Sequence, residues 1–326
     1  RKTKPLIKIA SQNMRGKGKG GITGEKWQDI HLRIKEDKIG ILLLQEAHLT
    51  EEEAAQIEGN YRRLRILTSP TPGKETSAGG VACVVNTELI AVADMEHRVI
   101  VPGRAASISI PWHGERRFTI LNIYAPAGDN NEKLEFFQNL NEAYAQDKTL
   151  KKPDYMVGDF NVVEKGEDRS SGGDDDPEVV DALWELKLRF GLQDAYRVNY
   201  PDTRNYTWRA GGDDTVWARL DRGYIATSLI PYMKTIEIHN AGITSDHLML
   251  TMDIEGRDAP YQGPGRWAMP LDLLDNIKIT RLVETLGRKA TSEIENIEQR
   301  TEEHNAQIIL NKFKIEVKSK MREYDK

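Results

Sequence analysis

Short runs of apolar and β-branched residues alternate with amphipathic helical patterns from Leu6 to about Ile254, and this alternation constrains the fold more than any other feature. Such an order is typical of sheets covered by helices. Helix starts are also visible, because Thr50 and Glu53 match a capping box. We therefore expect an α/β protein. The strand candidates are residues 6–9, 41–44, 63–67, 80–85, 105–110, 118–123, 155–157, 206–208, 218–225, 235–238 and 248–252.

Two helical stripes in this region predict core packing rather than sites. One consists of Leu134, Phe137, Leu140 and Tyr144, and the other of Val180, Leu183, Trp184 and Leu188.

The composition excludes several classes of protein. The chain of 326 residues is long enough for one large domain that needs no disulfide, and its single cysteine, Cys83, lies in an apolar run. No apolar run is long enough to cross a bilayer, and no signal peptide is visible. We expect a soluble protein of a reducing intracellular compartment, with no membrane partner.

The sequence changes character after Asp258, where a cluster of proline and glycine is followed by a charged, strand-poor and helix-rich segment. We expect an enzymatic domain over residues 1–258 and a helical connector over residues 259–326. Ile309, Phe313, Val317 and Met321 recur at helical spacing, so a partner helix or a following domain should cover them. Because the chain starts at Arg1 and stops inside a helical pattern, it is expected to be part of a longer protein.

Short polar clusters follow or precede several predicted strands, where a rigid sheet can bring loops together. The clusters are residues 13–16, 45–46, 158–161 and 245–247, with residues 124–126 and 219–221 between them.

The residue types in these clusters match the needs of phosphodiester hydrolysis, which requires a hard cation, a positioned water and groups that stabilise charge. Glu46 and Asp246 are suitable Mg²⁺ ligands. Asp159 is a candidate general base, and Asn161 an orienting amide on the same side of the chain. His247 would contact the phosphate as a donor while a nearby carboxylate holds its ring.

Taken in order, these motifs resemble the endonuclease/exonuclease/phosphatase superfamily over roughly residues 6–254. The resemblance implies a four-layer α/β sandwich of the DNase I-like kind with a C-terminal helical extension. The site roles that it implies are Glu46 on the metal with Asn13 and Asp246 nearby, Tyr124 near the scissile phosphate, Asp159 handling the water, Asn161 stabilising the transition state, and Asp221 paired with His247. Taken alone, Tyr124 could equally be a core residue.

Residues 45–49 and 123–126 most resemble the apurinic-endonuclease-like domain of LINE-type (non-LTR) retrotransposons, and residues 263–267 with 273–274 resemble its connector to a reverse transcriptase. This resemblance implies Mg²⁺-dependent, or Mn²⁺-dependent, nicking of double-stranded DNA in the nucleus. The products would be a 3′-hydroxyl, which primes reverse transcription, and a 5′-phosphate. RNA or a reverse transcriptase domain would be a further partner of the full-length protein. Ala47 and Arg222 depart from the usual pattern of this subfamily, and neither is a presumed catalytic residue.

Two alternatives remain at this point. The chain could be an apurinic/apyrimidinic repair endonuclease, or a nucleic-acid-binding module without activity. The complete acidic set argues against the second alternative.

The basic residues Arg15, Lys17 and Lys19 lie in a glycine-rich segment that contains no acid, although the chain has a net charge of −5. A loop that binds DNA phosphates and a solvated basic segment are equally good interpretations. The same segment matches a dinucleotide-binding pattern, which would leave the other clusters unexplained. Arg209, in a predicted hairpin over residues 208–217, is a candidate groove contact, although a solvated turn is nearly as good an interpretation.

Overall fold

The computed structural model describes residues 3–113, 116–210, 216–258 and 276–324. The chain divides into two compact units, Arg1–Pro260 and Tyr261–Lys326. Residues 263–267 and 273–274, which resemble a retrotransposon connector, lie outside the described residues.

The described residues of the first unit form two six-stranded sheets and a two-stranded one. In the first large sheet β1 and β2 are parallel, joined through α1 (Glu25–Glu36), and the other neighbours are antiparallel. The strand order is β13 (Met233–His239), β14 (Met249–Glu255), β1 (Leu6–Asn13), β2 (Ile39–Gln45), β4 (Val81–Asn86) and β3 (Leu64–Ser69).

The second large sheet is arranged in the same way, because β7 and β8 are parallel and joined through α3 (Asn130–Gln146). Its order is β5 (Glu96–Val101), β6 (Ala105–Pro111), β7 (Arg117–Tyr124), β8 (Tyr155–Asp159), β12 (Asp221–Ala226) and β9 (Leu192–Asp194). The small sheet pairs β10 (Trp208–Arg209) with β11 (Trp217–Ala218). Further elements are α2 (Glu51–Asn60), α4 (Pro177–Phe190), α5 (Ala195–Asn199), η1 (Gly21–Thr23), η2 (Gly166–Asp168) and η3 (Thr227–Tyr232).

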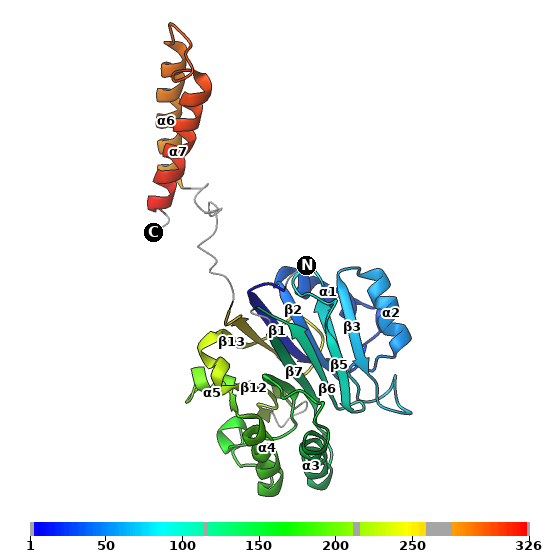
Figure 1. The fold of residues 1–326 in the computed structure, drawn as a ribbon. Coiled ribbons are helices and arrows are strands. Elements are labelled where there is room, and N and C mark those ends of the chain that lie inside the picture. Colours follow the sequence, from blue (N-terminus) through cyan, green and yellow to red (C-terminus); the bar gives the residue numbers. More distant parts are fainter. Residues whose placement is uncertain (1–2, 114–115, 211–215, 259–275, 325–326) are drawn as a thin grey trace. The chain divides into compact units, whose positions relative to one another are not determined.

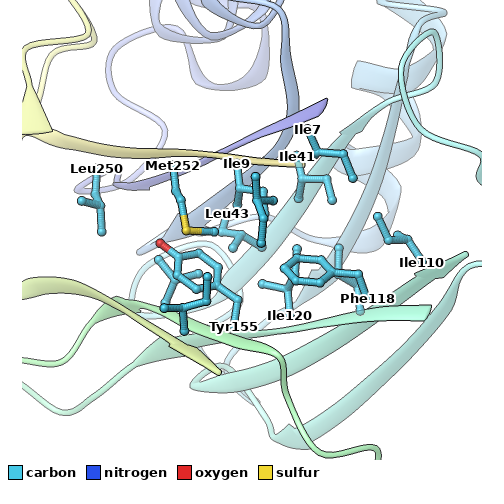
Figure 2. Packing of buried hydrophobic residues seen from close by; sticks show 14 of the residues in the cluster. Ile7, Ile9, Ile41, Leu43, Ile110, Phe118, Ile120, Tyr155, Leu250 and Met252 are labelled. Atoms are coloured by element: carbon cyan, nitrogen blue, oxygen red, sulfur yellow. The ribbon is translucent and has the colours of Figure 1, made fainter. Parts of the chain in front are cut away.

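Three apolar layers hold these elements together. Between the sheets, residues such as Ile9 and Leu43 face Phe118 and Tyr155 (Figure 2). Helices α1 and α2 cover the outer face of the first sheet, and α3 and α4 cover that of the second (Figure 1). Every residue of β2 is buried, because alternate side chains point into the central layer and under the helices. The predicted four-layer α/β sandwich is confirmed.

Two expectations about local structure were wrong. Trp184 and Leu188 are 53% and 63% exposed, because α4 is apolar on more than one face and buries Val179 and Leu186 together with the predicted Leu183. Strand β5 was missed because its exposed, charged sequence lacks the alternation of a buried strand.

The second unit contains α6 (Ile277–Glu295) and α7 (Ala306–Tyr324). Ile279 of α6 and Met321 of α7 are buried in one small cluster, so α6 is the partner helix expected for the apolar face of α7. No helix among the described residues combines the length and apolar character needed to span a membrane.

Candidate active site

The loops that follow β1 and β2 meet because parallel strands present their carboxyl ends at one edge. The Met14 amide donates to the Gln45 carbonyl over 2.8 Å, and the Gly16 amide to that of Glu46 over 2.9 Å. Glu46 has a φ of 48°, a left-handed conformation that non-glycine residues rarely adopt. Strain of this kind often accompanies functional sites, and here it turns Glu46 toward the β1 loop.

Asn13 connects the two acids expected at the centre of the site. Its Nδ2 donates to Glu46 Oε1 over 3.1 Å and to Asp159 Oδ2 over 2.9 Å. Its Oδ1 accepts from the Arg15 backbone amide over 2.9 Å. Asn13 therefore lies beside Glu46 as expected, and its contacts are those of a residue that orients carboxylates.

Asp159, Asp221 and His247 form the buried centre of the site. Nδ1 of His247 lies 2.8 Å from Asp221 Oδ2, and Nε2 lies 4.0 Å from Asp159 Oδ2. Burial alone would lower the pKa of His247, but Asp221 raises it to about 9. Burial and the charge of Asp221 raise the pKa of Asp159 to about 6. At neutral pH the site thus holds a protonated histidine between the side chains of Asp159 and Asp221.

Asn161 and Tyr124 complete the centre. The backbone amide of Asn161 donates to Asp159 Oδ1 over 3.0 Å. The side-chain Nδ2 of Asn161 donates to the Ala125 carbonyl, also over 3.0 Å. Burial and the nearby charge of Glu46 raise the pKa of the Tyr124 phenol well above its usual value. The phenol therefore stays protonated and can donate a hydrogen bond.

Ser245 fixes the segment that carries Asp246 and His247. Its Oγ donates to the Asn13 carbonyl over 2.7 Å and accepts from the His247 amide over 3.1 Å. Nε2 of Gln12 donates to the His247 carbonyl over 3.1 Å. The Asp246 side chain, 30% exposed, forms an ion pair of 3.1 Å with Arg15. Asp246 therefore lies at the rim of the site.

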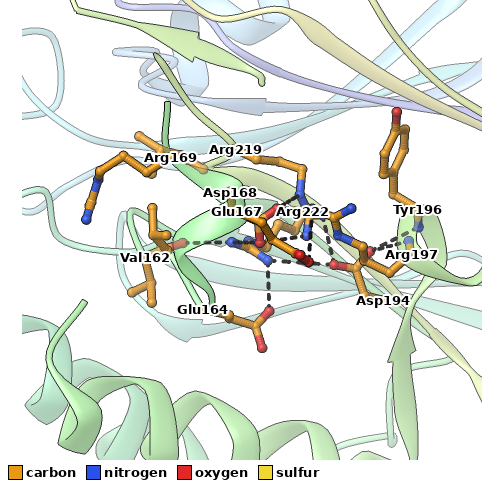
Figure 3. A network of polar contacts seen from close by, with 12 residues as sticks. Val162, Glu164, Glu167, Asp168, Arg169, Asp194, Tyr196, Arg197, Arg219 and Arg222 are labelled. Atoms are coloured by element: carbon orange, nitrogen blue, oxygen red, sulfur yellow. Dashed lines mark hydrogen bonds and ion pairs between the residues drawn. The ribbon is translucent and has the colours of Figure 1, made fainter. Parts of the chain in front are cut away.

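A buried ion-pair network supports the strand that carries Asp221 (Figure 3). Arg219 donates to Asp168 over 2.8 and 3.0 Å, and Arg222 pairs with Asp168 and Glu164, each over 3.0 Å. Burial opposes ionisation of Glu164, yet Arg222 and Lys187 lower its pKa to about 2. Removing one partner of such a buried pair generally costs about 3–5 kcal/mol. Arg222 thus has a structural role here.

The candidate DNA-binding residues differ in their surroundings. Lys17 pairs with Glu53 over 2.5 Å, and only 14% of its side chain is exposed. Its charge is therefore already used in an ion pair within the fold. Arg15 is 68% exposed, and Lys19 lines a cavity of about 600 Å³ together with Asp246. Arg209 lies 5.0 Å above the ring of Trp217, beside a second cavity of about 460 Å³ that also reaches Asp246.

Sequence reasoning missed Lys26 and Arg104. Lys26 is buried in α1, and its Nζ donates to the carbonyls of Met14 and Gly16 over 2.7 and 3.0 Å. Arg104 lies 4.6 Å above the ring of Tyr124. A single lysine in a helix and a single arginine in a turn carry no spacing signal that could reveal these contacts.

The sequence matches no protein-family model and no curated protein. Solved structures resemble the fold. An AP endonuclease, LMAP from Leishmania major, is 18% identical with a TM-score of 0.64, over 77% of this chain and 88% of the other. The 3′ phosphatase NExo from Neisseria, bound to product DNA hairpin, is 18% identical with a TM-score of 0.60, over 76% and 99%.

The endonuclease domain of TRAS1, a telomere-specific non-LTR retrotransposon, is 14% identical with a TM-score of 0.56, over 77% of this chain and 99% of the other. At these identities the comparisons establish the fold. The chain therefore has the DNase I-like α/β fold of these proteins.

Proposed function

We propose that this protein is a metal-dependent nuclease that nicks double-stranded DNA, leaving a 3′-hydroxyl and a 5′-phosphate. One observation carries the proposal: Asn13 joins Glu46 to Asp159, and Asp159 lies 4.0 Å from the ring of His247. This arrangement brings together Glu46, which can bind a metal ion, Asp159, which can take a proton from water, and protonated His247, which can contact a phosphate. The nuclease and phosphatase names of the structures with this fold support it.

Glu46 and Asp246 fit a hard divalent cation. Burial and the charge of Arg15 lower the pKa of Lys26, while the charges of Asp246 and Glu46 act in the opposite direction, so both carboxylates lie near the same ammonium group. Asp159, Asp221 and His247 also offer ligand atoms within 4.8 Å of one another. We favour Glu46 and Asp246 as the metal ligands for two reasons. The contact between His247 and Asp221 is that of a charged pair, and a cation bound by Glu46 and Asp246 can keep several of its water ligands. Bound Mg²⁺, or Mn²⁺, would supply positive charge to the non-bridging phosphate oxygens.

The remaining residues have separate tasks in the proposed reaction. Asp159 accepts the proton of the attacking water and holds that water in line. Protonated His247 donates to a phosphate oxygen, and Asp221 keeps its ring in this orientation and charge state. Asn161 stabilises the charge that develops on phosphorus-bound oxygen, and Tyr124 orients Glu46 near the scissile phosphate.

The assignment to a LINE-type retrotransposon is the finer part of the proposal. It rests on residues 45–49 and 123–126 and on the fold likeness to the TRAS1 domain. On this proposal the enzyme acts in the nucleus, residues 259–326 form a connector, and a reverse transcriptase domain or RNA is a further partner. A repair endonuclease is the second candidate, favoured by the likeness to LMAP. Comparing nicking of duplexes with and without an abasic site separates the two.

Supercoiled plasmid incubated with the protein and Mg²⁺ is expected to become open circular, and a chelator should stop the reaction. End-labelling before and after phosphatase treatment should show 5′-phosphate ends. Nicking that persists undiminished in excess chelator would contradict the metal requirement. A preparation that never nicks, while it melts cooperatively and binds Mg²⁺, would contradict the proposed activity.

The pairing of Asp221 with His247 predicts non-additive losses. Asp221→Ala should free the His247 ring and lower its pKa, so this variant should resemble His247→Ala. We expect the two single variants and the double variant to nick at rates within about one order of magnitude of one another. A double variant whose loss equals the product of the two single losses would show that the residues act independently.

A further inference from the structure

The loop that follows β8 carries Asn161 in an uncommon backbone conformation. Asn161 has a φ of 49°, in the left-handed region that few residues with a side chain enter, although asparagine enters it more often than most. Its contacts with Asp159 Oδ1 and with the Ala125 carbonyl fix the two amide groups of Asn161 itself. The direction of the backbone after Asn161 therefore depends on contacts made further along the loop.

Asp175 makes such contacts at Val163, shortly after Asn161. Asp175 Oδ2 accepts from the Val163 amide over 2.9 Å, and the Asp175 amide donates to the Val163 carbonyl over 3.2 Å. Val163 is buried, so solvent does not offer its amide another acceptor. Both polar backbone groups of Val163 thus depend on Asp175.

Arg169 holds the Asp175 carboxylate in place. Arg169 Nη2 pairs with Asp175 Oδ1 over 2.5 Å, and Arg169 Nη1 donates to the Gly173 carbonyl over 3.1 Å. The two oxygens of the carboxylate therefore have separate partners, a cation on one and the Val163 amide on the other. Bonds in which one partner is charged are stronger than neutral ones, so Asp175 is a firm anchor for the loop.

The place of Asp175 before α4 does not explain these contacts. Asp176 is the residue that caps this helix, because its side chain accepts from the Glu178 amide over 2.9 Å. Asp174 is exposed to solvent. Asp175, between them, turns instead to the loop that carries Asn161.

A second contact reaches the same loop from β12. Arg222 Nη2 donates to the Val162 carbonyl over 3.3 Å (Figure 3). This bond is longer than the bond between Asp175 and the Val163 amide, and the Arg222 guanidinium already pairs with Glu164. Of the two anchors, Asp175 is therefore the one to test.

We propose that Asp175 is a positioning residue that holds Asn161 in its left-handed conformation through Val163. The inference deepens the proposed nuclease function and rests on it, because Asn161 is the residue assigned there to stabilise the transition state. Asp175 acts on the reaction only through Asn161. Such stabilisation is sensitive to small displacements, because the donor must face the charge where it develops.

The first test compares Asp175→Ala, Asp175→Asn and Asp174→Ala, the last being the matched control at the exposed neighbouring position. We expect Asp175→Ala to lower kcat for nicking by about tenfold or more and to leave KM within about twofold of the wild type. Asp175→Asn should recover part of the rate, because its carbonyl oxygen can still accept from the Val163 amide. Asp174→Ala should nick at the wild-type rate.

The same change made in Asn161→Ala separates positioning from a general structural role. In this background we expect Asp175→Ala to lower the nicking rate by less than about twofold, because the residue that it positions is already gone. An equal fold-loss in the two backgrounds would overturn the proposal. So would a fall in melting temperature that accounts for the whole loss in Asp175→Ala.

Amide hydrogen exchange of the protein without DNA or metal makes the test independent of nicking. We expect Asp175→Ala to speed exchange at both Asn161 and Val163 by about tenfold or more, and to leave the Leu43 amide of β2 unchanged. In the wild type the Asn161 and Val163 amides should be equally protected, because one opening of the loop frees both.

Faster exchange confined to Val163 would overturn the proposal. If Asp175→Ala does not fold, unequal protection of the Asn161 and Val163 amides in the wild type would overturn it as well. A protein in which the two amides exchange together but which nicks no DNA would contradict the proposed function and leave the positioning of Asn161 standing.

Discussion

Replacing Asp159 with asparagine is expected to lower the nicking rate by about 10³-fold or more while DNA binding stays intact or becomes tighter. The Asp159 carboxylate accepts hydrogen bonds from Asn13 Nδ2 and from the Asn161 backbone amide. Its negative charge is needed to take a proton from water. The same charge repels the phosphate, so its removal should not weaken the complex. The fold should survive, because the change keeps the volume and removes a buried charge.

Single-turnover nicking and equilibrium binding to an uncleaved duplex should be measured on the same preparations. Asp181→Asn, an exposed position of α4, is the control and should behave as the wild type. Equal losses of binding and turnover in Asp159→Asn would indicate that Asp159 supports the structure rather than the water.

Replacing Glu46 with glutamine should lower nicking by about 10³-fold and weaken Mg²⁺ binding, because the change removes the charge that holds the cation and keeps the shape. The glutamine could still accept a hydrogen bond from Asn13 Nδ2, so the melting temperature should change little. Glu52→Gln, on the exposed side of α2, is the control for a lost surface charge. Full nicking together with unchanged Mg²⁺ affinity, measured by calorimetry, would show that Glu46 is not a metal ligand.

Local signals in the sequence were enough to predict the fold class and the edge of the sheets where the polar clusters meet. Strand β2 illustrates the reason: a continuous apolar run followed at once by Gln45 and Glu46 specifies a strand buried on both faces that ends in a polar loop. Parallel pairing with β1 then brings Asn13 to Glu46. Such signals depend only on the residues of one segment and its neighbours.

The pairing of charges was decided by the tertiary structure alone. Lys17 and Arg15 look alike in the sequence, yet Glu53 of α2 holds one while the other remains largely exposed. Arg104 and Arg222 were not assigned a role, because their contacts are with residues of other strands and loops that only the folded chain brings against them. Spacing reports which face of an element a residue occupies, whereas the partner of a charge depends on which elements the folded chain brings against that face.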